Sequence, residues 1–233
     1  MKCMRENPLS SIGRFARVAA LSALAFALAP VGPADAAKAK PSFFGSVEVR
    51  SHNLKPFKKW GTALKRYGVE KKSGKMPKCT SKRLKICNYG DWAKFLDSLR
   101  DRPKWVQIKA VNARMNKAKY TNDKANWGRK DYWATPGEFM ARFGDCEDYA
   151  IVKYLSLRNL GFRDKELRVV AVKDLNLKVG HAILVVFYKD EKTGKKRTFV
   201  LDNQIKRVVD AKSIRHYKPI FSINRTFWWR HRT

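Results

Sequence analysis

The chain has 233 residues, which is enough for one domain with a substantial hydrophobic core. Lys and Arg outnumber Asp and Glu by 51 to 20, so the formal net charge is +31. A charge of this size favours binding to anionic surfaces such as those of a cell envelope. The sequence contains none of the usual DNA- or RNA-binding motifs, so we expect no nucleic-acid partner.

Residues 1–37 predict a secretory signal peptide. A basic start leads into an apolar run over 18–29, and Ala34-Asp35-Ala36 supplies the small residues that signal peptidase accepts. The apolar run is short for a membrane span, and an uncleaved anchor is the alternative. Cleavage near Ala36 or Ala37 would leave about 196 residues, a length that suits one domain. It would also remove Cys3.

Residues 38–90 are expected to form a basic N-terminal arm. Positions 38–85 hold fifteen Lys or Arg but only two acidic residues, Glu48 and Glu70, with little periodicity. We therefore expect a loosely structured, solvated segment with a short helix around 57–67.

The cysteines divide into a pair and a single residue. Cys79 and Cys87 lie eight residues apart in the arm, and an oxidising compartment permits a disulfide between them. Two unpaired thiols are the alternative. Cys146 is then the odd cysteine of the exported chain, and it is a candidate for a reactive thiol or an intermolecular bridge.

From residue 91 to 233 the pattern predicts a folded domain that begins with helices. Apolar spacing predicts helices over 91–100 and from Pro103 onward, followed by a long polar loop over 120–133. Thr135-Pro-Gly-Glu138 combines a capping Thr, a Pro at the first helical position and a Glu three residues on, which predicts a short helix to about residue 142. Gly144 interrupts the pattern. A second helix over 145–160 then places Cys146 at its N-terminus, where it begins an inward-facing stripe.

The second half of this domain predicts strands. Residues 167–172, 181–188 and 197–201 are rich in Val, Ile, Phe and Tyr, and Thr193-Gly194 predicts an antiparallel hairpin between the last two. A further strand is expected at 217–223, and the final WWRH is either a last strand or an aromatic flap. The fold class is α+β, with helices packed on an antiparallel sheet.

The predicted hairpin brings a histidine near a carboxylate. If its loop is centred between 190 and 195, residues whose numbers add up to about 385 stand opposite each other. His181 and Asp202 fall two short of that value, which keeps both side chains on one face of the sheet. A cysteine nucleophile needs such a pair, because an imidazole takes the thiol proton and a third polar group orients the imidazole. The helix N-terminus adds positive potential that favours the thiolate of Cys146.

Each of these three residues is ordinary when taken alone. A histidine at the start of a strand, a buried cysteine and an aspartate in a turn usually have structural roles. Their combination with the helix N-terminus and the hairpin register favours a catalytic triad of Cys146, His181 and Asp202.

Three sequence motifs carry a family resemblance. GDCEDYA around Cys146, GHAILVV around His181 and FVLDNQ around Asp202, in this order, resemble the bacterial transglutaminase-like cysteine proteinases. The resemblance extends from about residue 91 through YWATPGEF to YKPIFSIN. It implies a papain- or transglutaminase-like core with the nucleophile at a helix N-terminus, and the roles of nucleophile, general base and orienting residue for Cys146, His181 and Asp202.

The resemblance also implies a biological setting. The best-understood members of the family are periplasmic, clip a large surface adhesin and thereby release biofilm. Expected partners are thus a protein substrate, an inner-membrane regulatory receptor and the anionic envelope surface. These members need calcium, and carried over to this chain the resemblance assigns calcium binding to Asp145, Glu147 and Asp148.

The residues themselves leave the calcium site open. Three bare carboxylates near a thiolate would disfavour it, and a hard cation would relieve this by gathering their oxygens beside the sulfur. Acidic residues also favour the first turn of any helix. Three carboxylates fall short of the six to eight oxygens that Ca²⁺ takes, so backbone carbonyls, water or a loop would have to supply the others.

Several functional alternatives also stay open. The triad suits acyl transfer to an amine as well as hydrolysis, so a transglutaminase-type acyltransferase is possible in place of an endopeptidase. A cell-wall peptidase would use the same order of cysteine and histidine, although no wall-binding repeat is visible. The non-enzymatic alternative is a basic envelope-binding protein with a vestigial triad.

Overall fold

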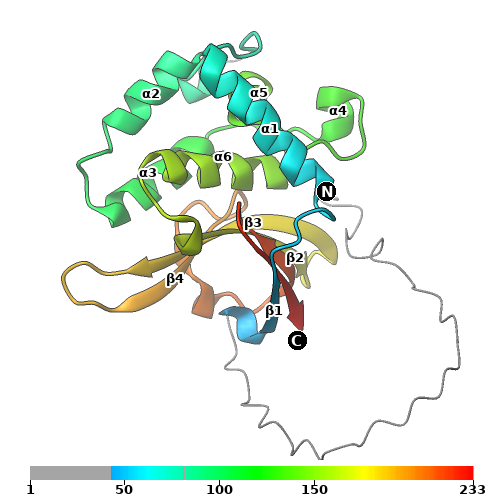
Figure 1. The fold of residues 1–233 in the computed structure, drawn as a ribbon, viewed down its shortest axis with the longest axis vertical. Coiled ribbons are helices and arrows are strands. Elements are labelled where there is room, and N and C mark those ends of the chain that lie inside the picture. The colour runs from blue at the N-terminus through cyan, green and yellow to red at the C-terminus, as the bar shows by residue number, and fades with distance from the viewer. Residues whose placement is uncertain (1–42, 81, 233) are drawn as a thin grey trace, which may run out of the picture.

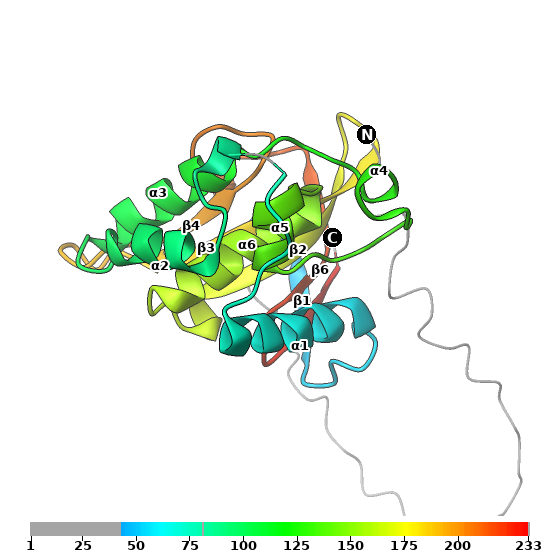
Figure 2. The ribbon, with the colours of Figure 1, turned by 90° about the horizontal axis from the view of Figure 1, so that it is seen from above.

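The computed structural model describes residues 43–80 and 82–232, so the expected signal peptide and its cleavage site lie outside the described residues. A seven-stranded antiparallel sheet with strand order β1-β7-β6-β2-β3-β4-β5 carries a layer of helices on one face (Figures 1 and 2). The strands are β1 (Val47–Ser51), β2 (Leu167–Asp174), β3 (Val179–Lys189), β4 (Lys196–Leu201), β5 (Val209–Asp210), β6 (Tyr217–Ile223) and β7 (Trp228–Arg232). The helices are α1 (Lys58–Ser73), α2 (Tyr89–Asp97), α3 (Lys104–Met115), α4 (Asp123–Trp127), α5 (Pro136–Arg142) and α6 (Cys146–Asn159), with 3-10 turns η2 (Phe43–Gly45), η3 (Lys82–Leu84), η4 (Asp164–Glu166) and η5 (Ala211–Ser213). The predicted α+β class is therefore confirmed.

The helix α6 lies at the centre of the molecule. It packs on β2 and β3 on one side and against α3 and α5 on the other (Figure 1). Every residue from Cys146 to Leu157 is buried, so the expected inward stripe widens to the whole circumference of the helix. A helix enclosed between a sheet and further helices has no solvent face, which explains the absence of a polar side.

The hairpin of β3 and β4 has the predicted register. Leu184 pairs with Leu201 and Val185 with Val200, so opposed residue numbers add up to 385 as expected. The strand pattern in the sequence was sufficient here, because a hairpin register is fixed by the position of its turn.

The basic arm differs from its expected loose structure. From residue 43 onward it contributes β1, which pairs with β7 at the edge of the sheet, and α1, which is longer than the expected helix. Trp60 and Ala63 of α1 are almost fully buried, and the Trp60 indole N–H donates to the carbonyl oxygen of Asn224 at 3.2 Å. Few apolar residues alternate with many exposed lysines in α1, so the apolar periodicity of a helix is weak in this part of the sequence. Cys79 and Cys87 form the expected disulfide.

Three further segments can be compared with the expectations from the sequence. The predicted loop over 120–133 contains the short helix α4, which is capped by the side chain of Asn122 at the N–H of Ala125. The C-terminal WWRH forms strand β7, not a flap. The predicted capping box of α5 is present, with Glu138 accepting from the N–H of Thr135 at 2.8 Å and Thr135 accepting from the N–H of Glu138 at 3.1 Å.

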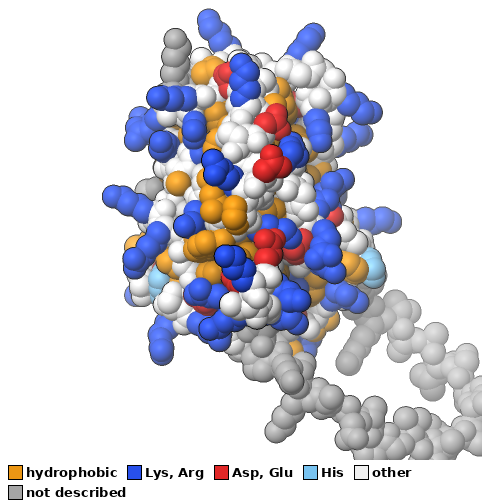
Figure 3. Space-filling model, turned by 90° about the vertical axis from the view of Figure 1, so that its left-hand side faces the viewer, with side chains coloured by type: hydrophobic (Ala, Val, Ile, Leu, Met, Phe, Trp, Pro, Cys, Tyr) orange, Lys and Arg blue, Asp and Glu red, His pale blue; other side chains and the backbone are white. Residues whose placement is uncertain are grey.

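The second face of the sheet carries a smaller apolar cluster. Val170, Val172, Ile183 and Val185 lie beneath the 3-10 turns η2 and η5, which bring Phe43 and Ala211 onto this face. In the view of Figure 3, Lys and Arg side chains project around the outline of the molecule, and hydrophobic side chains gather in the lower half of the face. Within residues 43–80 and 82–232, no helix is both long and apolar enough to cross a membrane.

Candidate active site

Cys146 is the first residue of the buried helix α6. The chain reaches it through a turn in which Phe143 has φ of 66°, a region that few residues other than glycine adopt. The carbonyl oxygen of Gly144 accepts from the N–H of Thr121 at 2.9 Å, which ties the turn to the segment before α4. A Cβ at Gly144 would lie 2.1 Å from Oδ2 of Asp148, so this position accepts only glycine. These contacts fix where α6 begins and therefore where the sulfur lies.

His181 and Asp202 lie side by side, as the hairpin predicts. His181 is on β3 and Asp202 directly follows β4, and both side chains are almost completely buried. His181 Nε2 is 2.9 Å from Asp202 Oδ1, which also accepts from the backbone N–H of Gln204 at 2.8 Å. The hydroxyl of Tyr217 donates to Asp202 Oδ2 at 2.6 Å. Both oxygens of the Asp202 carboxylate are therefore in hydrogen-bonding contact with the protein.

These donors decide the charge of Asp202. Burial alone favours the neutral acid, but the hydrogen bonds from His181 and Tyr217 and the charge of the imidazole hold the pKa of Asp202 below its usual range. Burial and the neighbouring carboxylate raise the pKa of Tyr217, so its hydroxyl remains a proton donor. Asp202 is therefore a carboxylate that contacts the imidazole of His181 at Nε2.

The sulfur of Cys146 lies beside the backbone of β3. The N–H of Ala182 donates to Sγ at 3.2 Å, and Oε2 of Glu147 lies 3.2 Å from Sγ. Nε2 is the ring nitrogen of His181 that contacts Asp202. Nδ1 is buried and has no hydrogen-bond partner in the described part of the chain.

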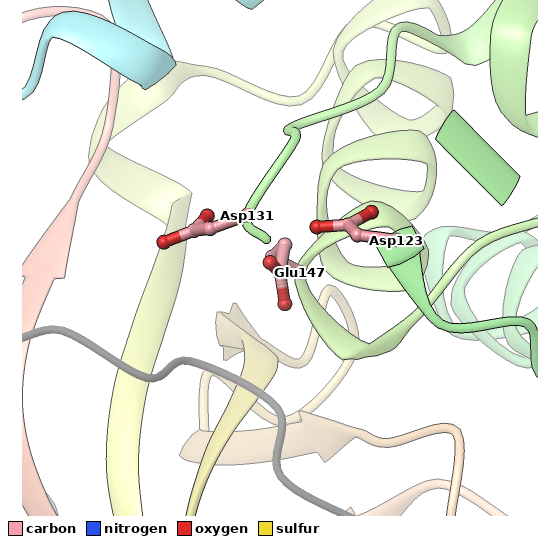
Figure 4. A group of neighbouring side chains, drawn as sticks. All are labelled: Asp123, Asp131 and Glu147. Carbon is pink, nitrogen blue, oxygen red and sulfur yellow. The ribbon is translucent and has the colours of Figure 1, made fainter. Parts of the chain in front are cut away.

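Five carboxylates gather around the start of α6. Oxygens of Asp123, Asp145 and Asp148 lie within 4.8 Å of one another, and so do oxygens of Asp123, Asp131 and Glu147. Asp123 and Asp131 come from the segment around α4 and approach Glu147 from two sides (Figure 4). The family resemblance had assigned calcium binding only to the three acids next to Cys146.

Burial makes these acids difficult to ionise without a cation. It raises the pKa of Asp145 to about 7 and that of Asp123 to about 6. Burial and the charges of neighbouring acids also raise the pKa values of Glu147 and Asp148 well above their usual range. Oδ1 of Asp123 and Oδ1 of Asp145 are buried without a hydrogen-bond partner among the residues that the structure describes. Clustered carboxylate oxygens that lack protein donors fit a hard divalent cation, which takes oxygen ligands.

A sequence profile of the bacterial transglutaminase-like cysteine proteinases (BTLCP) matches residues 76–229. The chain belongs to this family. It is a cysteine peptidase with a papain- or transglutaminase-like fold. The resemblance read from the three motifs is thereby confirmed, and the match begins within the basic arm.

Solved structures of a family protein from Legionella pneumophila support the same assignment. LapG from this organism is 31% identical to the chain over 60% of it and 75% of LapG, with a TM-score of 0.52. A calcium-bound LapG structure is 27% identical over 73% of the chain and 86% of LapG, with a TM-score of 0.55. An EGTA-treated LapG structure is 31% identical, with 61% and 75% coverage and a TM-score of 0.53. No curated protein sequence matches the chain.

In this cysteine proteinase, sequence reasoning missed three residues of the site. Tyr217 lies in a predicted strand, but its contact with Asp202 depends on the position of β6, which the sequence does not give. Asp123 and Asp131 lie in the stretch read as a long loop. A concentration of Asp in a loop was visible in the sequence, but nothing there placed the loop over the start of α6.

A buried lysine, Lys153, lies on the same helix as Cys146. Lys153 lies two helical turns after Cys146 on the same face of α6. Its side chain is fully buried, and Nζ has no hydrogen-bond partner in residues 43–80 and 82–232. Burial lowers the pKa of Lys153 to about 7, although the charge of Asp202 opposes this shift. Lys153 is therefore a buried amine whose pKa is influenced by the charge of Asp202.

The helix α3 anchors the loop that begins with Asp202. Asn116 Nδ2 donates to the carbonyl oxygens of Asp202 at 2.7 Å and Ile205 at 3.3 Å. Asn112, one turn earlier, donates through Nδ2 to the carbonyl oxygen of Lys206 at 3.3 Å. These side-chain contacts hold the loop backbone, and with it the carboxylate, at the end of β4.

Proposed function

We propose that this protein is an exported cysteine endopeptidase in which Cys146, His181 and Asp202 form the catalytic triad. The observation that carries the proposal is the 2.9 Å contact of His181 Nε2 with Asp202 in the same buried site as the Cys146 sulfur. Ala182, the neighbour of His181, donates its N–H to that sulfur. A carboxylate, an imidazole and a sulfur in this order provide a general base that is oriented for thiol deprotonation.

The chemistry follows from these positions. His181 takes the proton of the Cys146 thiol, and the sulfur attacks the carbonyl carbon of the substrate while the carbonyl oxygen gains negative charge. Backbone N–H groups at the start of α6 are suited to stabilise that oxygen. The tetrahedral intermediate collapses with cleavage of the C–N bond, and the imidazolium gives its proton to the leaving amine. Water, deprotonated by His181, then hydrolyses the thioester and regenerates the thiol.

The test of this proposal is site-specific alkylation of Cys146 by iodoacetamide, followed by peptide mass mapping. Protein recovered from the periplasm is reduced, freed of reductant and labelled between pH 5 and 9. We expect His181→Ala to slow labelling of Cys146 at neutral pH at least tenfold, since general-base assistance contributes about 10²–10⁴-fold in enzymes. His52→Ala, which changes an exposed histidine, is the matched control. Equal labelling rates in all three proteins would contradict the triad.

Hydrolysis and acyl transfer differ in the group that attacks the thioester. Once a cleaved substrate is known, a lysine-like amine in excess separates the two reactions by product mass. We expect the free acid to dominate. A product that carries the amine would instead favour the transglutaminase-type reaction.

We further propose that the acidic cluster binds calcium. Asp145, Glu147 and Asp148 are the expected ligands, and Asp123 and Asp131 add carboxylates that the sequence pattern did not identify. The calcium-bound structure of the similar LapG supports this choice of ion. A bound divalent cation would supply positive charge that allows the buried acids to ionise next to the sulfur.

Calcium binding is tested by thermal unfolding of chelated protein during titration with Ca²⁺. We expect the melting temperature to rise with Ca²⁺, and we expect Asp145→Ala with Glu147→Ala to abolish the response. The control is Asp97→Ala with Asp101→Ala, which removes the same charge from exposed positions that are distant in sequence from the acidic cluster. A melting temperature that does not change with Ca²⁺ would contradict the site.

The family resemblance supports a periplasmic location and a large surface adhesin as the substrate. An inner-membrane receptor as regulator and the anionic envelope surface as a further contact are consistent with the same setting and with the charge of +31. Comparison of cell-surface proteomes with and without the gene tests the substrate. Loss of an N-terminally clipped adhesin fragment in the deletion strain is the expected result, and identical surface proteomes would contradict it.

A further inference from the structure

A cavity lies on the face of the sheet that the large helices do not cover. Its volume is about 1180 Å³, and residues of η2, β3, β4 and η5 contribute to its lining. Three phenylalanines, Phe43, Phe44 and Phe187, provide aromatic surface. The ring centroids of Phe43 and Phe187 are 5.8 Å apart, so two distant segments meet there. No step of the proposed reaction uses these residues.

Positive charge surrounds this aromatic surface. Seven Lys or Arg line the cavity but only two acidic residues, Glu166 and Asp210. Both acids are already paired, Glu166 with Arg163 at 3.1 Å and Asp210 with Arg197 at 3.1 Å. Most of the remaining positive charge therefore has no counter-charge at the cavity.

Three of these basic residues are exposed and available to a partner. Lys196, Lys212 and Arg215 form no ion pair with any residue in the described ranges. An apolar surface flanked by uncompensated cations complements a segment that combines acidic and apolar side chains.

The edge of the sheet gives that segment a backbone to pair with. Strand β5 is the last strand, and it pairs only with Phe199 and Val200 of β4. The outer edge of β4 over 196–198 has no strand partner among the described residues, and these same residues line the cavity. An open edge beside a cavity is the arrangement in which an extended peptide adds a strand to a sheet.

We propose that this cavity is a docking groove for an extended acidic segment of a partner protein, which adds a strand to the open edge of β4. The open edge favours a peptide over a lipid surface, because only a peptide can satisfy backbone hydrogen bonds. Tyr217 lines the groove and also donates to Asp202, so a docked segment lies against the ring that holds the orienting carboxylate. The groove is thus separate from the sulfur but shares a wall with the triad.

The proposal is tested with a fluorescein-labelled decapeptide of alternating Glu and Val and the purified full chain. The groove variant combines Lys196→Glu, Lys212→Glu and Arg215→Glu. The control variant combines Lys65→Glu, Lys72→Glu and Lys94→Glu, which changes the net charge equally at exposed positions on α1 and α2. We expect the groove variant to weaken binding at least tenfold and the control variant less than threefold.

Two further probes separate the possible occupants. An N-methylated form of the decapeptide cannot donate backbone hydrogen bonds, and we expect it to bind at least tenfold more weakly. Vesicles that contain phosphatidylglycerol should lose affinity equally for both charge variants. Equal peptide binding by the two variants, or equal binding of the N-methylated peptide, would overturn the proposal. Limited proteolysis can remove the residues before Phe43. If the peptide binds only after this removal, the groove belongs to the chain's own N-terminal segment, and the proposal of a partner protein is overturned.

Discussion

Replacement of the buried Lys153 should stabilise the protein in a pH-dependent way. Lys153 is fully buried without a hydrogen-bond partner in the described chain, and burial lowers its pKa from 10.5 to about 7. Between these values the unfolded chain holds a proton that the folded chain has lost. Stability therefore rises with pH in this window and is lowest at and below pH 7.

The size of the effect follows from the shift in pKa. Each pKa unit corresponds to about 1.4 kcal/mol, so the lysine costs about 4 kcal/mol of unfolding free energy at pH 7 and about 1.4 kcal/mol at pH 9.5. Lys153→Met fills a similar volume without a charge. The gain in unfolding free energy from this substitution should thus shrink by about 3 kcal/mol between pH 7 and pH 9.5.

Urea unfolding of the wild-type protein and Lys153→Met at a series of pH values measures this difference. Subtraction of the two curves removes the titration of all other groups, provided that they are independent of Lys153. Lys94→Met, at an exposed position of α2, is the control and should show no dependence of the difference on pH. A difference between Lys153→Met and wild type that is constant with pH would show that Lys153 stays charged in the fold and would refute the reasoning.

Three further substitutions test the site and its support. Tyr217→Phe removes a hydrogen-bond donor from Asp202. A hydrogen bond to a charged group is worth about 1.5–3 kcal/mol. We therefore expect iodoacetamide labelling of Cys146 to slow about tenfold and the pH profile of labelling to shift. Cys79→Ser opens a short loop, which should lower the unfolding free energy by about 2–3 kcal/mol and make the melting temperature insensitive to reductant. Gly144→Ala places a methyl group against Asp148 and should weaken calcium binding at least tenfold in calorimetric titration.

The tyrosine and glycine substitutions have matched controls, and each of the three has a result that would contradict it. Tyr67→Phe removes a hydroxyl that contacts Asn159, away from the triad, so equal slowing of labelling by both tyrosine variants would indicate a general loss of stability. Gly61→Ala adds a methyl group in a helix with no atom within 4 Å, and it should leave calcium affinity unchanged. Unaltered calcium affinity in the Gly144 variant would contradict the position of the ligands. A reductant-sensitive melting temperature in the Cys79 variant would contradict the disulfide as its source.

The sequence by itself determined the parts that depend on local pattern. The capping box at Thr135 and the break at Gly144 predicted where helices begin, because capping is a contact between residues three apart. The turn at Thr193-Gly194 fixed the hairpin register and therefore the contact of His181 with Asp202. The disulfide of the arm was predicted from the oxidising compartment that export would imply, with two unpaired thiols as the alternative.

Only the tertiary structure decided what depends on packing between distant segments. The Lys-rich arm became an edge strand and a core helix. Trp60 of this helix packs against Trp133 and Tyr154, which come from distant segments, so the local composition could not show its burial. The carboxylates of Asp123 and Asp131 reach the start of α6 only when their loop folds back over it. Lys153 is a buried charge for the same reason, since a sequence cannot show that a helix will be enclosed on every side.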